Sequence, residues 1–465
     1  MKKIKITKKI LLISITSSVA LIILVLFAPY PIYIKNLDSK PAKVLTDEQV
    51  FEYQQTIKER YPQKAIRPLP YQVKIDELNI HAKSAIAVDF ESGCIMYEKN
   101  SEEKIPPASM TKLVLMYVAL DAISQGKVDY TDIVELPSES WAKNAPPHSS
   151  LMFLGEGQHV TLDELITGLN VVSGNDAAVA IAIYIFGSVD ECISKMNETV
   201  KGMGLHNTHF EEVSGYSEKN ITTAKDFSIF CVNYVRKFPF ALQKYHSLKS
   251  FTYPKAHNLK DGWTYERGQR EGIPIEGTMP ITQKATNLAL TKIPYADGLK
   301  TGYIDESGYN LALSVYKDGQ RLISVTMGGP GNTATEGGML RAEDAVLISD
   351  WVYKAFSSVP VGKMESVRLK VPGGKSYCCN LIEVCPENHY VLCPNITDEN
   401  GNYYQLARKI VLDEIKDFSV EEGNQYGKVE YYYGSNLIDT TILVADRTIE
   451  KGNLLRRMWA KMAEK

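Results

Sequence analysis

The sequence predicts an α/β domain followed by a small β-rich domain. Alternating apolar residues open the first domain at residues 84–99, helix-like segments fill its middle, and alternating segments return after residue 300. From Val359 onward the chain consists of short alternating segments separated by Gly, Pro and Asn. Alternation with a period of two indicates strands, whereas apolar residues three or four positions apart indicate helices. We therefore place the α/β domain at residues 80–357 and the β-rich domain at 358–448.

The length and the net charge limit the classes of protein to which the chain can belong. The chain has 465 residues, of which 44% are hydrophobic, and a formal net charge of -3. This length is enough for two or three domains with cores of their own. Nucleic-acid-binding domains carry a strong excess of basic residues, so we expect no nucleic-acid partner.

Residues 1–35 predict an export signal or a membrane anchor. Five lysines lie within the first nine residues, and Ile10–Ala28 follows without a charge. This apolar run is about long enough to span a bilayer, and Pro29 and Pro31 follow it in place of a small-residue cleavage pattern. An uncleaved anchor is favoured over a cleaved signal. The positive-inside rule keeps the lysines in the cytoplasm, so we expect the rest of the chain outside the membrane.

Residues 36–79 are predicted to form a linker with a helical stalk. Thr46 and Gln49 have the spacing of a capping box, and Val50, Tyr53 and Ile57 recur at helical spacing behind it. We interpret this helix as a spacer.

The α/β domain is predicted from two hairpins and two prominent helices. The segments AIAVDF and CIMYEK flank the turn ESG, and NLALSVY and RLISVTMGG flank Lys317–Gly319. A helix beginning near Ala108 meets no breaker before Gly126, and residues 340–356 form a long amphipathic helix.

The tail, residues 449–465, predicts an amphipathic helix. Leu455, Met458 and Trp459 fall on one face, and basic residues lie mostly on the other. This composition is typical of a helix that lies in a membrane interface with its tryptophan facing outward. The alternative is a terminal helix docked on its own domain.

Four of the seven cysteines cluster in the β-rich domain, at Cys378, Cys379, Cys385 and Cys393. An exported location permits disulfides among them. Their spacing fits no zinc pattern, and we expect no metal and no cofactor.

The segment PPASMTK, residues 106–112, suggests a nucleophile. Proline favours a helix start, so Ser109 and Lys112 fall one turn apart at the beginning of a core helix. A serine hydroxyl needs a base within hydrogen-bond reach, and Lys112 can serve only if burial or a nearby cation lowers its pKa.

Two further motifs contain residues that could act together with Ser109 and Lys112. Ser173 and Asn175 lie in the sequence SGN, on a turn between two helix-like segments, and KTG begins at Lys300. Ser173 can relay a proton to a leaving amine, and Asn175 can orient Lys112 and a substrate amide. Lys300 can supply the second cation, Thr301 can bind a carboxylate, and Gly302 lets a substrate approach the strand closely.

These three motifs stand in an order that the chain shares with a known family. In PASMTK, SGNDA, DGLKTGY and TTAKD the chain resembles the low-molecular-mass penicillin-binding proteins, the serine D-alanyl-D-alanine carboxypeptidases. The resemblance spans roughly residues 80–450. It implies a β-lactamase/transpeptidase-like domain, with an antiparallel sheet, helices and a helical subdomain, followed by a small β-rich domain.

The resemblance also implies a mechanism and partners. Ser109 would attack the penultimate D-alanine carbonyl of a peptidoglycan stem peptide, with Lys112 as base, and the acyl-enzyme would be hydrolysed. The oxyanion would sit between the backbone N–H groups of Ser109 and Tyr303, and Lys300 with Thr301 would hold the terminal carboxylate. β-Lactams would trap the serine. We expect the catalytic domain outside the cytoplasmic membrane of a bacterium.

Two departures from the family and several alternatives remain. Position 303 is Tyr where several relatives have His, and residues 254–280 form an insertion that we expect to overhang the cleft. A β-lactamase of the same fold is disfavoured, because the glutamate motif ExxLN is absent between Asn175 and Lys300. An endopeptidase would use the same residues. A catalytically idle wall-binding or β-lactam-sensing protein would not need them intact.

Overall fold

The computed structural model describes residues 8–57, 59–62, 64–73, 78–259, 279–362, 366–386 and 388–464. The chain divides into two compact units. The larger unit comprises residues 64–359 and 392–396, and the smaller one comprises residues 1–63, 360–391 and 397–465.

The larger unit is built on a six-stranded sheet in the order β1-β3-β2-β10-β9-β8. All of its neighbouring strands are antiparallel except β1 and β3. Both predicted hairpins are present, as β2 with β3 and as β9 with β10. The strands are β1 (Arg67–Pro68), β2 (Ser84–Asp89), β3 (Cys94–Lys99), β8 (Ala296–Ile304), β9 (Gly308–Lys317) and β10 (Gln320–Gly329).

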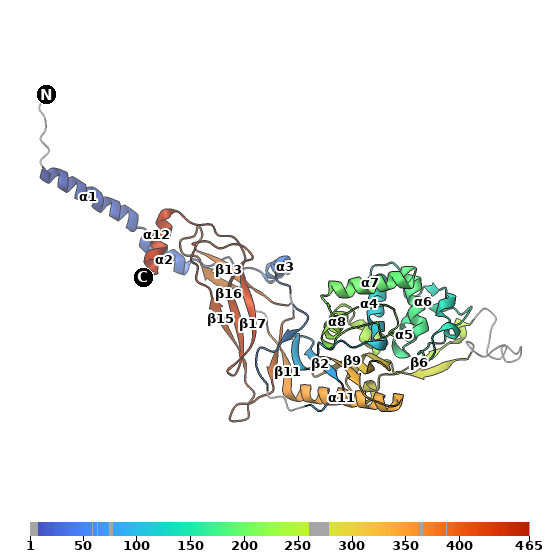
Figure 1. The fold of residues 1–465 in the computed structure, drawn as a ribbon. Coiled ribbons are helices and arrows are strands. Elements are labelled where there is room, and N and C mark those ends of the chain that lie inside the picture. The colour runs from blue at the N-terminus through green and yellow to red at the C-terminus, as the bar shows by residue number, and fades with distance from the viewer. Residues whose placement is uncertain are drawn as a thin grey trace. The chain divides into compact units, whose positions relative to one another are not determined.

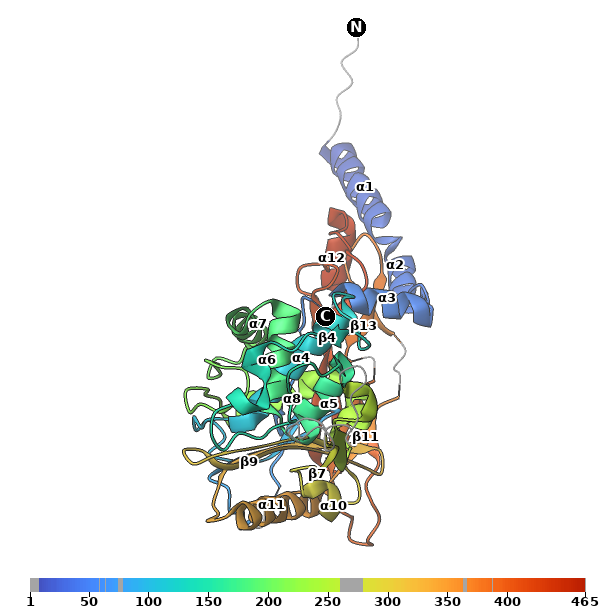
Figure 2. The same ribbon diagram turned by 90° about the vertical axis from the view of Figure 1, so that its right-hand side faces the viewer.

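Helices cover both faces of this sheet (Figure 1). In β2, Ile86 and Val88 point into a core shared with the central helices, whereas Ala85 and Ala87 pack on the side of α11 (Ala334–Ala355). The alternation in the sequence therefore reflects a sheet that is buried on both faces. Figure 2 shows α11 on one side of β9, and α4 and α8 on the other.

The remaining elements of the larger unit surround this frame. Two short pairs, β4 with β5 and β6 with β7, lie outside the main sheet. The predicted 254–280 insertion connects β6 to β7, but its residues 260–278 lie outside the described part of the chain, so its expected overhang stays a prediction. The elements are α4 (Thr111–Ser124), α5 (Leu162–Val171), α6 (Asn175–Phe186), α7 (Val189–Gly202), α8 (Ala224–Lys237), α10 (Ala289–Lys292), β4 (Ile133–Val134), β5 (Val160–Thr161), β6 (Ser250–Tyr253) and β7 (Ile281–Lys284).

The smaller unit contains a five-stranded antiparallel sheet in the order β12-β13-β17-β16-β15. The chain enters it after β11 (Phe356–Pro360), close to the predicted boundary at 357/358. It then returns in β14 (Tyr390–Pro394), which pairs with β11, and the residues from Leu392 to Ile396 belong to the larger unit. The strands are β12 (Val367–Lys370), β13 (Cys378–Val384), β15 (Leu406–Leu412), β16 (Gln425–Tyr433) and β17 (Asn436–Ala445).

The predicted stalk helix exists as α3 (Asp47–Ile57), but it is not a free spacer. Ile57 is buried against Val384 and Val444 of the smaller unit's sheet. Gln54 donates to the backbone oxygen of Glu383 at 2.8 Å, and Tyr53 donates to a backbone oxygen of β17. The same apolar spacing that predicts a helix also provides the face that packs on the sheet.

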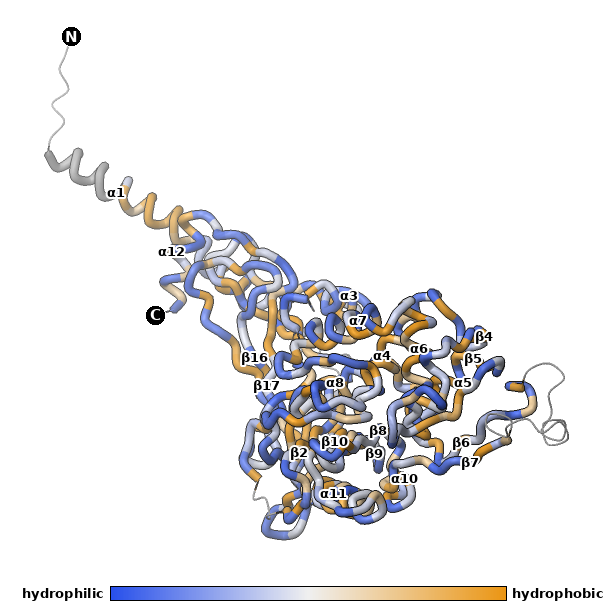
Figure 3. The backbone as a smooth tube through the Cα atoms, turned by 45° about the vertical axis from the view of Figure 1, so that its right-hand side comes forward, coloured by the Kyte–Doolittle hydropathy of each residue, from blue (hydrophilic) through white to orange (hydrophobic). Residues whose placement is uncertain are grey.

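The N-terminal apolar run is helical, in α1 (Lys8–Phe27), and α2 (Tyr30–Ser39) follows it. Within the residues described, one stretch, Ser17–Ser39, is long and apolar enough to cross a membrane. Figure 3 shows the hydrophobic colour along the coloured part of α1. A signal sequence would satisfy the same test of length and composition.

The C-terminal helix forms as α12 (Leu454–Ala463), with its tryptophan facing inward. Trp459 is 9% exposed, its ring lies 5.5 Å from that of Tyr33 in α2, and its Nε1 donates to the backbone oxygen of Leu26 at 3.0 Å. The expectation of an outward tryptophan was wrong, because the N-terminal helices provide an apolar surface for it. Leu454 remains 73% exposed.

The clustered cysteines do not form disulfides in the structure. Cys378, Cys379, Cys385 and Cys393 are free thiols.

Candidate active site

The segment before Lys112 forms a tight turn that projects Ser109. Ala108–Met110 is one turn of 3-10 helix, and α4 continues it from Thr111. Ala108 has a φ of +50°, a conformation that is uncommon for residues other than glycine. Such strain is typical of functional sites, where the surrounding structure holds a side chain in a required position. The helix predicted to start near Ala108 is therefore confirmed, with a 3-10 first turn.

Lys112 is 1% exposed and has three hydrogen-bond partners at its Nζ. These are Ser109 Oγ at 2.9 Å, Asn175 Oδ1 at 2.7 Å and the backbone oxygen of Ser214 at 2.5 Å. The amide oxygen and the backbone oxygen can only accept, so they take two N–H groups from the lysine. The third partner is a hydroxyl, which can also donate. A neutral amine therefore fits all three partners, with its lone pair toward the O–H of Ser109.

The electrostatic surroundings favour that neutral amine. Burial lowers the pKa of Lys112 to about 7, although Glu212 and Asp176 act in the opposite direction. A charged ammonium loses its hydration in the interior, and two carboxylates at some distance do not restore it fully. Near neutral pH a substantial fraction of Lys112 can thus accept a proton.

The SGN motif lies on the turn between α5 and α6, as predicted. Ser173 is 3% exposed and has a φ of +60°. Asp176, one residue into α6, accepts hydrogen bonds from the backbone N–H groups of Met152, Phe153 and Leu154, at 2.8 to 3.0 Å. These bonds fix the start of α6, and with it the side chain of Asn175 beside Lys112.

The KTG motif lies in β8, at the edge of the large sheet. Lys300 is 2% exposed, and its Nζ donates to Ser173 Oγ at 2.9 Å. Thr301 Oγ1 lies 2.7 Å from Thr286 Oγ1. Tyr303 points outward, is 45% exposed, and stacks on the ring of Tyr309 at 4.2 Å. The side chain at position 303 is thus exposed while its backbone pairs with β9, so a change from His to Tyr can be accommodated there.

Gly302 sits against the nucleophile turn itself. A Cβ at this position would lie 2.4 Å from the backbone oxygen of Pro107 and 3.2 Å from the backbone nitrogen of Met110. We expected this glycine to admit a substrate. The contact that the structure describes is between β8 and the turn that carries Ser109, so the glycine brings those two segments together.

Two buried lysines, Lys112 and Lys300, lie close enough for the charge of the first to lower the pKa of the second. The pKa of Lys300 is lowered well below its usual value by burial first, then by repulsion from Lys112 and Arg341. The sequence suggested Lys300 as a second cation near Lys112, and because the pKa of Lys300 is itself lowered, that role stays a prediction. Burial, however, is the largest cause of the low pKa of Lys112.

Several residues that surround these motifs were not predicted from the sequence. The backbone oxygen of Ser214 accepts from Lys112, and Glu212 holds that loop by accepting from the N–H groups of Ser214 and Gly215. Buried Arg341 of α11 donates to the backbone oxygens of Gly302 and Asn310. A backbone acceptor leaves no mark on a sequence, and these side chains belong to no motif.

The structure therefore brings the three predicted motifs together in the larger unit. Three hydrogen bonds connect them: Ser109 to Lys112, Lys112 to Asn175, and Ser173 to Lys300. A serine beside a buried amine of lowered pKa is an arrangement suited to nucleophilic catalysis.

Comparisons with known proteins agree with this chemistry. The family described as D-alanyl-D-alanine carboxypeptidase matches residues 71–331. The D-alanyl-D-alanine carboxypeptidase DacA of Escherichia coli (strain K12) is 32% identical over 387 residues, which cover 76% of this chain and 87% of that protein. DacF of Bacillus subtilis (strain 168) is 32% identical over 385 residues, which cover 82% and 89%.

Solved structures show the same fold. Penicillin binding protein 5 from Haemophilus influenzae superposes with a TM-score of 0.67 at 26% identity, and the match covers 81% of this chain and all of that one. Penicillin binding protein 6B from Escherichia coli gives a TM-score of 0.61 at 27% identity, covering 82% of this chain and all of that one. The predicted transpeptidase-like fold with a following β-rich region is confirmed.

Proposed function

The chain belongs to the D-alanyl-D-alanine carboxypeptidase family, and we propose that Ser109, Lys112 and Ser173 carry its reaction in the larger unit. The reaction is the hydrolysis of the terminal D-alanine from a peptidoglycan stem pentapeptide. The observation that carries the assignment of residues is the pair of hydrogen bonds that Lys112 makes to Ser109 and Asn175.

Acylation begins with proton transfer. The neutral amine of Lys112 takes the proton of the Ser109 hydroxyl as its Oγ attacks the penultimate D-alanine carbonyl. A C–O bond forms, and the carbonyl oxygen becomes an oxyanion. The backbone N–H groups of Ser109 and Tyr303 stabilise it, in keeping with the close approach of Gly302 to Pro107.

The tetrahedral intermediate then expels the terminal D-alanine. The C–N bond breaks, and the leaving nitrogen takes a proton that originates on Lys112. Ser173 relays this proton, and Asn175 keeps the lysine in place through its Oδ1. The products of this half-reaction are free D-alanine and an ester on Ser109.

Water completes the cycle by the reverse sequence of proton movements. Lys112, neutral again, accepts a proton from the attacking water, and Ser109 leaves as an alcohol. The second product is the stem tetrapeptide.

Lys300 and Thr301 bind the terminal carboxylate of the substrate. Lys300 is buried beside Ser173, and a carboxylate that enters the site would stabilise its charged form. This binding selects peptides with a free C-terminus. It also accounts for the trapping of Ser109 by β-lactams, whose carboxylate and reactive amide imitate the substrate.

The N-terminal apolar helix supports attachment to a membrane. We assign the larger unit to the outer side of the bacterial cell membrane, where peptidoglycan is found, because the lysines before the helix favour a cytoplasmic N-terminus. The exposed Leu454 of α12 leaves part of that helix available to the same surface.

The test uses the full chain in detergent and its Ser109→Ala variant. Mass spectrometry after incubation with penicillin should show one adduct on the wild type and none on the variant. D-Alanine release from a stem pentapeptide should be lost in parallel. An adduct on the variant would refute the assignment of Ser109, while a wild type that binds penicillin without releasing D-alanine would refute the activity.

A further inference from the structure

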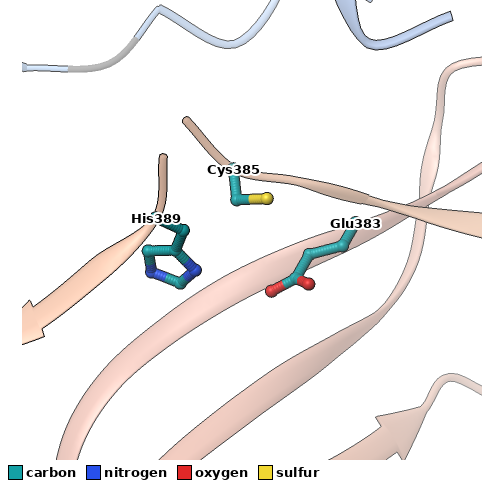
Figure 4. Close-up of side chains that lie close together, drawn as sticks. All are labelled: Glu383, Cys385 and His389. Carbon is teal, nitrogen blue, oxygen red and sulfur yellow. The ribbon is translucent and has the colours of Figure 1, made fainter. Parts of the chain in front are cut away.

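A second cluster of reactive side chains lies in the smaller unit, where β13 ends and β14 begins. Glu383 is near the end of β13, Cys385 follows that strand, and His389 directly precedes β14. One potential ligand atom from each of the three lies within 4.8 Å of the other two. Figure 4 shows the three side chains converging on one point.

His389 is held in a state suited to bind a cation. Its Nε2 lies 2.9 Å from Asp439 Oδ2, and both side chains are buried. A carboxylate can only accept, so Nε2 carries the hydrogen, and in the neutral imidazole Nδ1 then carries a lone pair. This Nδ1 is buried and has no hydrogen-bond partner within the part of the chain that is described. In Figure 4 it faces Glu383 and Cys385.

Glu383 is likewise buried and positioned. Its Oε1 accepts hydrogen bonds from Tyr431 and Thr441, which leaves the other carboxylate oxygen for a ligand. The Tyr431 ring also packs edge-on against His389, 5.2 Å between centroids. Arg408, over the Tyr431 ring, supplies positive charge nearby, but the buried imidazole nitrogen itself has no partner among the described residues, and leaving it so is costly.

From this geometry we propose that Glu383, Cys385 and His389 bind one zinc ion, with Asp439 as the group that orients His389. A thiolate, a carboxylate and a neutral imidazole together balance the charge of a divalent cation. Zinc accepts this mixture of sulfur, nitrogen and oxygen ligands, and three protein ligands leave a fourth position for water. A carboxylate on the far nitrogen of a ligating histidine is the usual supporting contact.

The distances need only a small adjustment. Tetrahedral zinc holds such ligand atoms roughly 3.3 to 3.6 Å apart, from bond lengths near 2.0 Å to N and O and 2.3 Å to S. The present separations, at most 4.8 Å, can close through rotation of the Cys385 and Glu383 side chains. On binding, the Cys385 thiol releases its proton to solvent, and a metal–sulfur bond replaces the S–H bond.

A nucleophilic Cys385, activated by His389 and Asp439, is the rival interpretation. The pKa of the Cys385 thiol is raised to about 12, by burial first and then by Glu383 and Asp439, whereas Arg408 and Gln54 act in the opposite direction. A nucleophilic cysteine needs the opposite, a lowered pKa. Cys385 thus lacks the activation of a nucleophile, and the convergence of its sulfur with Glu383 and His389 favours a metal ligand.

The sequence predicted no metal, because the cysteine spacing fits no zinc pattern and no cluster of histidine and acidic residues is apparent along the chain. The zinc ligands come from one cysteine, one glutamate and one histidine, and their orienting aspartate lies 50 residues beyond the histidine. A bound ion would join the end of β13 to the residue before β14, and the contact of His389 with Asp439 would connect it to β17.

The experiment uses the full chain in detergent, without an affinity tag, reduced and freed of metal by a chelator. Titration with Co²⁺ should reach one ion per chain and give a thiolate-to-cobalt charge-transfer band in the near ultraviolet. Zn²⁺ should displace the cobalt. Because this readout is made on the wild type, it does not depend on whether any variant folds.

Variants then locate the site. Cys385→Ser should abolish the charge-transfer band and weaken zinc binding by at least about tenfold, whereas Cys378→Ser, at the other end of β13, should change neither. Asp439→Asn should weaken zinc binding about 10- to 100-fold without removing the band. Labelling of each variant by a fluorescent penicillin checks the larger unit independently.

Three results would overturn the proposal. These are substoichiometric binding by the wild type, a cobalt spectrum without the sulfur band, and equal effects of Cys385→Ser and Cys378→Ser. None of them bears on the carboxypeptidase reaction, because the cluster lies in the smaller unit.

Discussion

Replacement of Gly302 by alanine tests whether the contact between β8 and the nucleophile turn sets the rate of acylation. The added Cβ would lie 2.4 Å from the backbone oxygen of Pro107, about 1 Å closer than ordinary contact at 3.4 Å. That oxygen belongs to the backbone, so β8 and the turn must separate by about 1 Å. A displacement of this size at reacting groups can reduce a rate by about 10²-fold. We therefore expect acylation by penicillin to slow by about two orders of magnitude.

The assay is the second-order rate of labelling by a fluorescent penicillin, followed by gel or mass spectrometry. Gly202→Ala is the matched control, because a Cβ at Gly202 meets nothing within 4 Å. It should label at the wild-type rate. Circular dichroism of both variants checks that the fold is retained. Labelling of a folded Gly302→Ala protein at the wild-type rate would refute the reasoning that this close approach positions Ser109.

Three further predictions concern charge and stability. Lys112 must be neutral to act, and its pKa is about 7, so acylation should fall about tenfold from pH 8 to pH 6; a flat profile would contradict the role. Lys300→Met should lower kcat/KM for D-alanine release by about 10²-fold, whereas the exposed control Lys292→Met should leave it unchanged. Equal kcat/KM values for the two variants would contradict a role of Lys300 in substrate binding. Asp176→Ala removes the acceptor of four backbone N–H groups and should cost about 2–4 kcal/mol in urea unfolding, whereas exposed Asp190→Ala should cost under about 0.5 kcal/mol. Equal losses would contradict the role of Asp176.

The sequence predicted the larger unit well because its signals are local. Both hairpins have alternating residues around a turn, and the sheet they form is buried on both faces. The three motifs could be joined only through a family resemblance, because nothing in the chain itself says that Lys112 meets a residue 63 positions away.

Features that depend on tertiary contacts could not be predicted from the sequence. An amphipathic helix shows that it has an apolar face, but not whether lipid or protein covers that face, and Trp459 packs on Tyr33. The same limit applies to α3, which packs on the sheet of the smaller unit. The positive φ of Ala108 could not be predicted either, because an alanine in the sequence does not indicate that conformation.

The prediction of the site from the sequence was incomplete for a related reason. Lys112 depends on the backbone oxygen of Ser214, and the loop that presents this oxygen is held by Glu212. Glu212 lies 100 residues from the lysine and belongs to no repeated pattern. Only the folded chain shows that the Lys112 amine has two fixed acceptors and one hydroxyl around it.

The most direct test of the account is a titration of the Lys112 amine by NMR, with lysine labelled with carbon-13 at Cε. The signal that disappears in Lys112→Arg identifies the residue. We predict that its chemical shift titrates with a midpoint near pH 7 in the unliganded protein. A midpoint above about pH 9, close to that of an ordinary lysine, would contradict the claim that an uncharged amine takes the proton of Ser109.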